Sequence, residues 1–338
     1  MKKYAIFVVA VFVLIARSKA FPAESNGSIK ETSSEEPDRV HFYLYTQPNF
    51  SEPYDIDMND VETLARSPFD FRNPTTFMIH GWNDVYTSGA TGSIREALSK
   101  TDQSKKPNFI SVDWRIYSKF ENYTKSQQLC STAGKEVAKF IDWMHENSKL
   151  RFDTLTLYGH SMGAQVAGFV GKNVQRGKVH TILGMDPAFP IFESLGPEDR
   201  LAETDAEYVE TMHTNGGQWG FYHPIGQTAF YPNGGKYQPG CGIDSDGMCS
   251  HQKAIYYLAE AIISGEKNEF HAVKCDELTQ VEESKCNKYE SIIRMADPRN
   301  AQKPRGIFYL ETNSEAPYAK GIAALLEKKE GIKKHAQS

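Results

Sequence analysis

The stretch Leu155-Thr156-Leu157-Tyr158-Gly159-His160-Ser161-Met162-Gly163-Ala164 decides the fold. It begins with β-branched, aromatic and other apolar residues, which predict a strand. The pattern Gly-x-Ser-x-Gly and a run of small residues follow, and they predict a sharp turn into a closely packed helix. Glycine on both sides of the serine lets neighbouring backbone pass close to a strained turn. Ser161 is therefore predicted to stand above the sheet at a helix N-terminus, where negative charge is favoured.

Predicted strands alternate with predicted helices along the rest of the chain, with no Pro/Ser-rich linker between them. This alternation favours an α/β fold in which a mostly parallel central sheet is covered by helices on both faces. We expect one domain over residues 39–325. Besides the elements around Ser161, the predicted strands are 40–45, 75–80, 108–114, 179–185, 208–213 and 306–310, and the predicted helices are 93–99, 126–145 and 251–263.

The first twenty residues are a predicted signal peptide. Lys2 and Lys3 precede an apolar run over residues 4–16, and Ser18-Lys19-Ala20 offers small residues for cleavage after Ala20. The apolar run is shorter than a membrane span requires, which disfavours the alternative of a signal anchor. We therefore expect a secreted, extracellular product with a flexible polar arm over residues 21–38 and a basic C-terminal tail over residues 326–338.

The composition is that of a globular protein. Hydrophobic residues make up 40% of the 338 residues, enough for a large core, and the formal net charge is −5. An acidic chain without a basic stripe gives no reason to expect a nucleic-acid partner. No Cys/His spacing resembles a zinc site, and we expect neither a metal nor a cofactor.

Secretion permits disulfide bonds and glycosylation. The most economical pairing of the five cysteines is local, Cys241 with Cys249 and Cys275 with Cys286, although spacing alone leaves other connectivities open. Cys130 lies on the apolar face of a predicted helix, which favours a buried structural thiol. The candidate glycosylation acceptors are Asn26, Asn49 and Asn122.

A serine nucleophile needs a base, and the base needs an acid that orients it. In proteins with this strand-turn-helix arrangement, the serine is followed along the chain by Asp or Glu and then by His. Each of these residues lies at the carboxyl end of a strand. Asp186 ends the next predicted strand and is our candidate acid, whereas its rival Asp205 precedes its strand. For the base we favour His251, which follows the Cys241–Cys249 loop, and His213 is the alternative.

The reaction also needs two backbone N–H groups that stabilise a developing oxyanion. One is predicted from Met162, directly after the nucleophile. The second is predicted from Trp82, because His80-Gly81-Trp82 follows an early strand.

Seven motifs in this order resemble the pancreatic lipase family. They cover the chain from about residue 40 to residue 322 and include Phe77-Met78-Ile79-His80-Gly81-Trp82, Ser111-Val112-Asp113-Trp114, Gly159-His160-Ser161-Met162-Gly163-Ala164-Gln165, Gly184-Met185-Asp186-Pro187-Ala188, Asp205-Ala206-Glu207-Tyr208-Val209, Gln238-Pro239-Gly240-Cys241 and Cys249-Ser250-His251. The resemblance implies an α/β-hydrolase fold and acyl-ester hydrolysis. It also implies Ser161, Asp186 and His251 as the triad, with Trp82 and Met162 as oxyanion donors.

The resemblance also implies a lid between the two cysteines that precede the base. Here this segment is short and polar, Gly242-Ile243-Asp244-Ser245-Asp246-Gly247-Met248, as in the phospholipase A1 branch of the family. The chain also ends too early for the β-sandwich domain that follows in triacylglycerol lipases. We therefore expect a phospholipase A1-like enzyme that acts on a lipid substrate, with transient contact to a lipid interface. A triacylglycerol lipase and a non-catalytic, yolk-protein-like lipid-binding protein are the alternatives.

Overall fold

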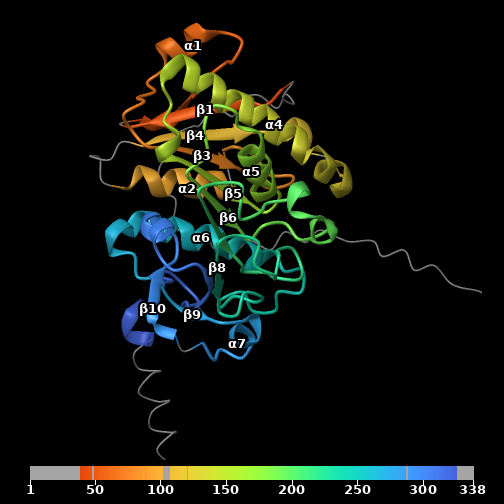
Figure 1. The fold of residues 1–338 in the computed structure, drawn as a ribbon, viewed down its shortest axis with the longest axis vertical. Helices are drawn as coiled ribbons and strands as arrows, with labels where there is room; N and C mark the ends of the chain where they lie inside the picture. The colour runs from red at the N-terminus through yellow and green to blue at the C-terminus, as the bar shows by residue number, and fades with distance from the viewer. Residues whose placement is uncertain are drawn as a thin grey trace, which may run out of the picture. The chain divides into compact units, whose positions relative to one another are not determined.

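A large twisted sheet organises the part of the chain that the computed structural model describes, residues 39–47, 49–87, 89–101, 107–119, 121–286 and 288–325 (Figure 1). The predicted signal peptide, N-terminal arm, basic tail and Asn26 lie outside these residues. Within them the strands are β1 His41–Thr46, β2 Asn49–Asp55, β3 Thr75–Ile79, β4 Asn108–Asp113, β5 Leu155–His160, β6 Thr181–Met185, β7 Tyr208–Met212, β8 Thr228–Pro232, β9 His271–Cys275, β10 Lys288–Arg294 and β11 Gly306–Leu310.

The α-helices connect these strands or cover the sheet. They are α1 Val61–Arg66, α2 Gly89–Ser99, α3 Arg115–Ser118, α4 Tyr123–Ser148, α5 Met162–Asn173, α6 Met248–Ser264 and α7 Leu278–Glu282. Short 3₁₀ helices occur at η2 Phe152–Thr154, η3 Phe192–Ser194, η4 Pro197–Asp199, η5 Gly265–Lys267 and η6 Pro298–Gln302.

The sheet order is β10-β9-β11-β8-β7-β6-β5-β3-β4-β1-β2. The consecutive strands from β11 to β4 pair in parallel, whereas β1, β2, β9 and β10 join antiparallel at the two edges. The carboxyl ends of the central strands therefore meet along one edge of the sheet, where ligands bind in open parallel sheets. The expectation of a mostly parallel sheet in an α/β fold is confirmed.

Helices cover both faces of the sheet, as predicted. Successive residues of a strand point to opposite faces, and β3 follows this rule: Phe77 and Ile79 pack with α4 and α5, whereas Met78 packs with α2 and α6. Figure 1 shows α4 and α5 side by side, with α2 and α6 together on the other side of the strands. The central strands thus lie between two apolar layers.

Helix α4 illustrates how local sequence sets an element. The side chain of Asn122 accepts hydrogen bonds from the backbone N–H groups of Thr124 and Lys125, which caps the helix start. Lys149 adopts a left-handed conformation at the other end. Cys130 on the buried face has no disulfide partner, as predicted, and burial raises the pKa of its thiol.

Several expectations need correction at their boundaries. Helix α4 is longer than residues 126–145, α2 begins at Gly89 instead of residue 93, and α6 begins at Met248 instead of residue 251. The sequence also failed to predict β2, β8, β9 and β10 as strands. The domain boundaries at residues 20, 38 and 325 stay predictions.

Within the described ranges, no helix combines the length and apolar character that crossing a membrane requires.

Candidate active site

Ser161 lies at a strained turn between β5 and α5. Its backbone has φ 55° and ψ −122°, a conformation that a residue with a side chain rarely adopts. A Cβ at Gly159 would lie 2.5 Å from the Ala164 Cα, and one at Gly163 would collide with the backbone of Ile79 and His80. Packing therefore demands both glycines of the Gly-x-Ser-x-Gly pattern, and the turn leaves Ser161 partly exposed.

Asp186 follows β6 at the same edge of the sheet and is fully buried. It has a positive φ of 43°, and its Oδ1 accepts hydrogen bonds from the backbone N–H groups of Thr214 at 2.7 Å and Asn215 at 3.0 Å. A Cβ at Gly220 would collide with this carboxylate, so only glycine fits there. Two fixed donors stabilise the negative charge in a place without solvent.

His251 lies in the first turn of α6, and its Nδ1 donates to Oδ2 of Asp186 over 2.6 Å. Because Nδ1 carries the proton of the neutral ring, Nε2 keeps the lone pair that a base requires. His160 packs its ring 4.6 Å from the His251 ring and donates to the His251 carbonyl. Burial, with a smaller contribution from His251, lowers the pKa of His160 well below its usual range. The ring beside His251 is therefore neutral.

The rival residues make other contacts. Asp205 forms an ion pair with Lys172 and accepts from the backbone N–H of Ala202. His213 is fully buried, donates from Nδ1 to the Phe221 carbonyl and accepts at Nε2 from the Thr211 hydroxyl. Both rivals thus serve the packing of loops in this structure, whereas Asp186 and His251 contact each other.

The loop after β3 passes directly beside Ser161. A Cβ at Gly81 would lie 3.3 Å from the Ser161 Cβ, so Trp82 follows within one residue of this approach. The indole of Trp114 donates to the His80 carbonyl over 2.8 Å and fixes the loop. Met162 is the first residue of α5, where helix geometry supplies no acceptor for its N–H. The loop that carries Trp82 and the helix start that carries Met162 therefore both lie beside Ser161.

Sequence reasoning missed several residues that support this arrangement. Gln165 is fully buried in α5, where its side chain donates to the Ala188 carbonyl and accepts from the N–H of Leu201. It thereby ties the helix after Ser161 to the loop after Asp186. A lone amide within a run of small and apolar residues was the available signal. The amides of Thr214 and Asn215 carried no such signal, because any residue has a backbone N–H.

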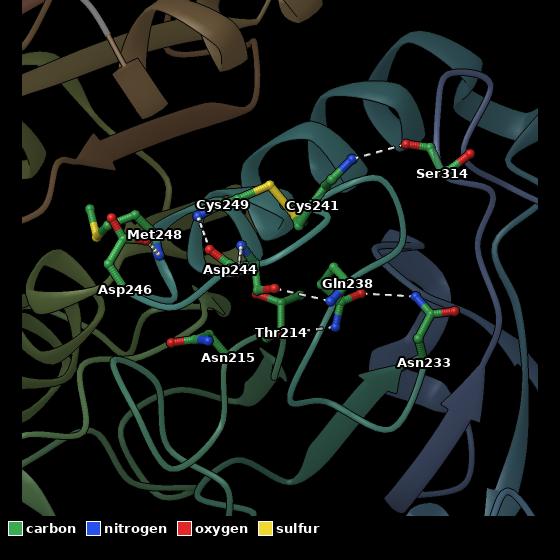
Figure 2. The surroundings of a disulfide bond; sticks show 12 residues. Thr214, Asn215, Asn233, Gln238, Cys241, Asp244, Asp246, Met248, Cys249 and Ser314 are labelled. Carbon is green, nitrogen blue, oxygen red and sulfur yellow. Dashed lines mark hydrogen bonds between the residues drawn. A yellow bond between two sulfur atoms is a disulfide. The ribbon is translucent and has the colours of Figure 1, made fainter. Parts of the chain in front are cut away.

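Both predicted disulfides are present, Cys241–Cys249 and Cys275–Cys286. Figure 2 shows the first of them beside the start of α6. The loop that it closes is held from the side by Trp219, whose Nε1 donates to the Asp246 carbonyl over 2.6 Å, and by Gln218, whose side chain donates to the Ser245 carbonyl. Ile243 projects outward and is 97% exposed.

No cluster of three His, Cys, Asp or Glu residues that could hold a metal ion occurs in the described part of the chain.

The chain is similar in sequence to one protein family and to several known proteins. The sequence model of the family described as Lipase matches residues 11–318. Lipoprotein lipase from Neovison vison is 31% identical over 288 residues, which cover 76% of this chain and 58% of that protein. Pancreatic lipase-related protein 2 from Cavia porcellus is 32% identical over 278 residues, 79% of this chain and 61% of that protein. The chain therefore spans less than two thirds of the length of these relatives.

Among solved structures, the chain matches the α/β hydrolase enzyme MGS-M1 from a Medee basin deep-sea metagenome library. The match has 12% sequence identity, covers 45% of this chain and 60% of that chain, and has a TM-score of 0.32. The fold assignment rests on the order and direction of the strands and not on this partial match.

Proposed function

Because the chain belongs to the lipase family, we propose that it is a carboxylic ester hydrolase that cleaves fatty-acyl esters of glycerolipids. The observation that carries the proposal is the buried contact of 2.6 Å between His251 Nδ1 and Asp186 Oδ2, at the sheet edge where Ser161 turns into α5. This is the arrangement that orients a histidine as a base for a serine hydroxyl. It also argues against a non-catalytic lipid-binding protein, which needs no such strained and desolvated contact.

In the proposed reaction the Ser161 Oγ attacks the ester carbonyl while His251 Nε2 takes the hydroxyl proton. The N–H groups of Met162 and Trp82 stabilise the oxyanion of the tetrahedral intermediate. His251 then gives the proton to the leaving alcohol, and the fatty acyl group stays on Ser161 as an ester. Water attacks this acyl-enzyme by the same route, releases the fatty acid and restores the serine.

Asp186 acts in this scheme by holding the imidazole and by stabilising its positive charge after proton transfer. The N–H groups of Thr214 and Asn215 keep the carboxylate in place while that charge appears. The neutral His160 ring beside His251 does not oppose the new charge as a cation would.

We further propose that phospholipids are preferred and that the sn-1 ester is cleaved. The segment between Cys241 and Cys249 is too short to cover a cleft, and Ile243 and Met248 are its apolar side chains. Among the aromatic residues of the neighbouring loop, Phe221 is buried against Phe189 and Tyr222 packs on Tyr231. Trp219 is partly exposed with its ring 6.4 Å from the His251 ring, and its Nε1 is bound to the Asp246 carbonyl. An uncovered cleft admits a charged head group, whereas a large apolar lid would favour neutral lipid at an interface.

Triacylglycerol hydrolysis is the second candidate. The observation in its favour is that both relatives above are named lipases and not phospholipases.

The predicted signal peptide supports a secreted enzyme. The described glycosylation acceptors Asn49 and Asn122 are both exposed, which suits glycosylation.

The test compares initial rates on mixed micelles of phosphatidylcholine with rates on emulsified triolein, and identifies the lysolipid that is released. We expect sn-1 cleavage and at least about tenfold slower hydrolysis of triolein. Ser161→Ala is the control and should lose about 10⁶ in kcat while it keeps its fold. Triolein favoured by about tenfold would support the second candidate, and ordinary activity of Ser161→Ala would exclude Ser161 as the nucleophile.

A further inference from the structure

The carboxylate of Asp244 is bound to the start of the helix that carries His251. Its Oδ1 accepts from the backbone N–H of Cys249 at 3.2 Å, and its Oδ2 accepts from that of Ser250 at 2.8 Å. Figure 2 shows Asp244 directed at this backbone, next to the disulfide. Helix α6 begins at Met248 after Gly247, a residue without a side chain to cap the helix. Asp244 supplies the missing cap from within the disulfide loop.

His251 is the next residue after the two amides that Asp244 binds. Its own N–H donates to the Gly247 carbonyl over 2.9 Å, so the first turn of α6 sets the place of the imidazole. Ser250 fixes the same turn from the other side, because its Oγ accepts from the N–H of Gln238. A contact of 2.6 Å to Asp186 leaves little room for this turn to shift.

We propose that Asp244 is a positioning residue for His251, and that the Cys241–Cys249 loop is a fixed cap of α6 and not a moving cover of the cleft. The proposal rests on the proposed function, since it assigns His251 as the base. The contacts of Trp219 and Gln218 with the same loop agree with a fixed segment. The polarity of the loop follows from its own structure, because the carboxylates of Asp244 and Asp246 accept hydrogen bonds from the backbone at the start of α6.

Asp246 is a matched control within the same loop. It is exposed, and its Oδ1 accepts from the N–H of Met248 at 3.1 Å, the first residue of α6. Removal of either carboxylate changes the net charge of the loop equally. Only Asp244 binds the two amides that directly precede His251, so a general effect of charge or loop stability would act through both residues alike.

The experiment measures kcat and KM of the full chain on the soluble ester p-nitrophenyl butyrate. We expect Asp244→Ala to lower kcat by about tenfold or more with KM changed by less than about twofold. Asp244→Asn should recover part of kcat, because the amide oxygen still accepts one hydrogen bond. Asp246→Ala should stay within about twofold of wild type in both constants.

A second readout separates positioning from contact with lipid. Each loop substitution is combined with Ser161→Ala, and binding to phosphatidylcholine vesicles is measured by co-sedimentation. We expect equal binding for the three loop variants. A raised KM or weaker vesicle binding in Asp244→Ala, with kcat unchanged, would overturn the proposal, as would equal loss of kcat in Asp244→Ala and Asp246→Ala.

The outcomes also distinguish this proposal from the proposed function. A wild-type chain without esterase activity contradicts the function itself, whereas an active wild type with a fully active Asp244→Ala contradicts only the role of Asp244. If Asp244→Ala does not fold, the pair Asp244→Asn and Asp246→Asn decides by the same criterion. Equal kcat in that pair would overturn the role of Asp244, and a lower kcat for Asp244→Asn alone would support it.

Discussion

Two buried carboxylates on neighbouring strands, Asp186 after β6 and Glu210 within β7, meet the same physical demand in different ways. Both are essentially without solvent exposure, and each accepts three hydrogen bonds. Asp186 accepts from two backbone amides and the His251 imidazole. Glu210 accepts from the N–H of Ala296, the Tyr208 hydroxyl and the Asn300 amide.

The difference lies in position and in partners. Asp186 stands at the carboxyl edge of the sheet with a positive φ, and one of its partners is a group that takes up protons. Glu210 lies inside a strand, and its partners hold the segment around Ala296 and Asn300 against the sheet. Burial raises the pKa of Glu210 to about 7. If Asp186 is the acid of the proposed mechanism, burial and full hydrogen bonding do not distinguish it from Glu210, whereas backbone strain at the sheet edge beside His251 does.

The largest effect is expected for the histidine that Asp186 holds. His251→Ala should lower kcat by about 10⁶, because the serine loses its base. His213→Ala serves as the control, since the His213 ring is buried, hydrogen bonds to Thr211 and Phe221 and stacks on the Tyr231 ring. It should lose stability and keep activity when folded. The kinetics of both variants on p-nitrophenyl butyrate check this, and the reverse ranking would identify His213 as the base.

Replacement of the two carboxylates tests the comparison directly. Asp186→Asn should lower kcat by about 10⁴, because the imidazole loses its orienting acceptor and the tautomer it imposes. Glu210→Gln should leave kcat within about threefold of wild type while the free energy of unfolding falls. Both quantities are measured on the same preparations. A loss of kcat in Glu210→Gln comparable with that in Asp186→Asn would show that burial alone is what matters.

Glu210 should contribute to the pH dependence of stability. The pKa of Glu210 is about 7 in the folded protein, and its ordinary value is 4.5. Between these two pH values Glu210 keeps its proton in the folded protein, whereas the unfolded chain has released it. Glu210 therefore makes its largest contribution to the free energy of unfolding below pH 4.5. This contribution should fall by about 1.4 kcal/mol per pH unit toward pH 7.

Glu210→Gln should remove this slope, whereas replacement of the exposed Glu207 by Gln should not. Urea unfolding of the three proteins at several pH values between 4.5 and about 7 measures the difference. If wild type and Glu210→Gln have parallel stability profiles, the ionisation of Glu210 does not depend on folding in the stated way.

The smallest effect is expected for Asp205, a third buried carboxylate. Burial raises its pKa, and the nearby Lys172 opposes that shift. Asp205→Asn keeps an acceptor for the N–H of Ala202 and loses the ion pair at a lysine that is 20% exposed. We expect a loss of about 1 kcal/mol in the free energy of unfolding and unchanged kcat. A large loss of kcat would instead favour Asp205 over Asp186 as the acid.

The centre of the molecule was predictable from sequence because its determinants are local. The close approaches at Gly159 and Gly163 require glycine, and the strand before Ser161 and the helix after it follow from adjacent residues. Asp186 could be found because the next buried strand ends there. The central parallel strands β3 and β4 are buried at every position, and their short apolar runs made them recognisable in the sequence.

The edges of the sheet and the support of the site were not predictable in the same way. Strand β2, Asn-Phe-Ser-Glu-Pro-Tyr-Asp, is polar and contains proline, which only an edge strand tolerates. Strand β8 ends in proline, and the register of β10 against β9 is irregular. The amides that bind Asp186 come from Thr214 and Asn215, far along the chain. Only the folded arrangement of the loops brings these groups together.

The central claim is that Ser161 is a nucleophile activated by His251 and held by the strained turn. The most direct measurement is the rate at which diethyl p-nitrophenyl phosphate modifies the protein, with the modified residue identified by peptide mass spectrometry. We predict a single modified residue, Ser161, in wild type and in His213→Ala at similar rates, and strongly slowed modification in His251→Ala. Modification of another serine, or an equal rate in His251→Ala, would contradict the claim.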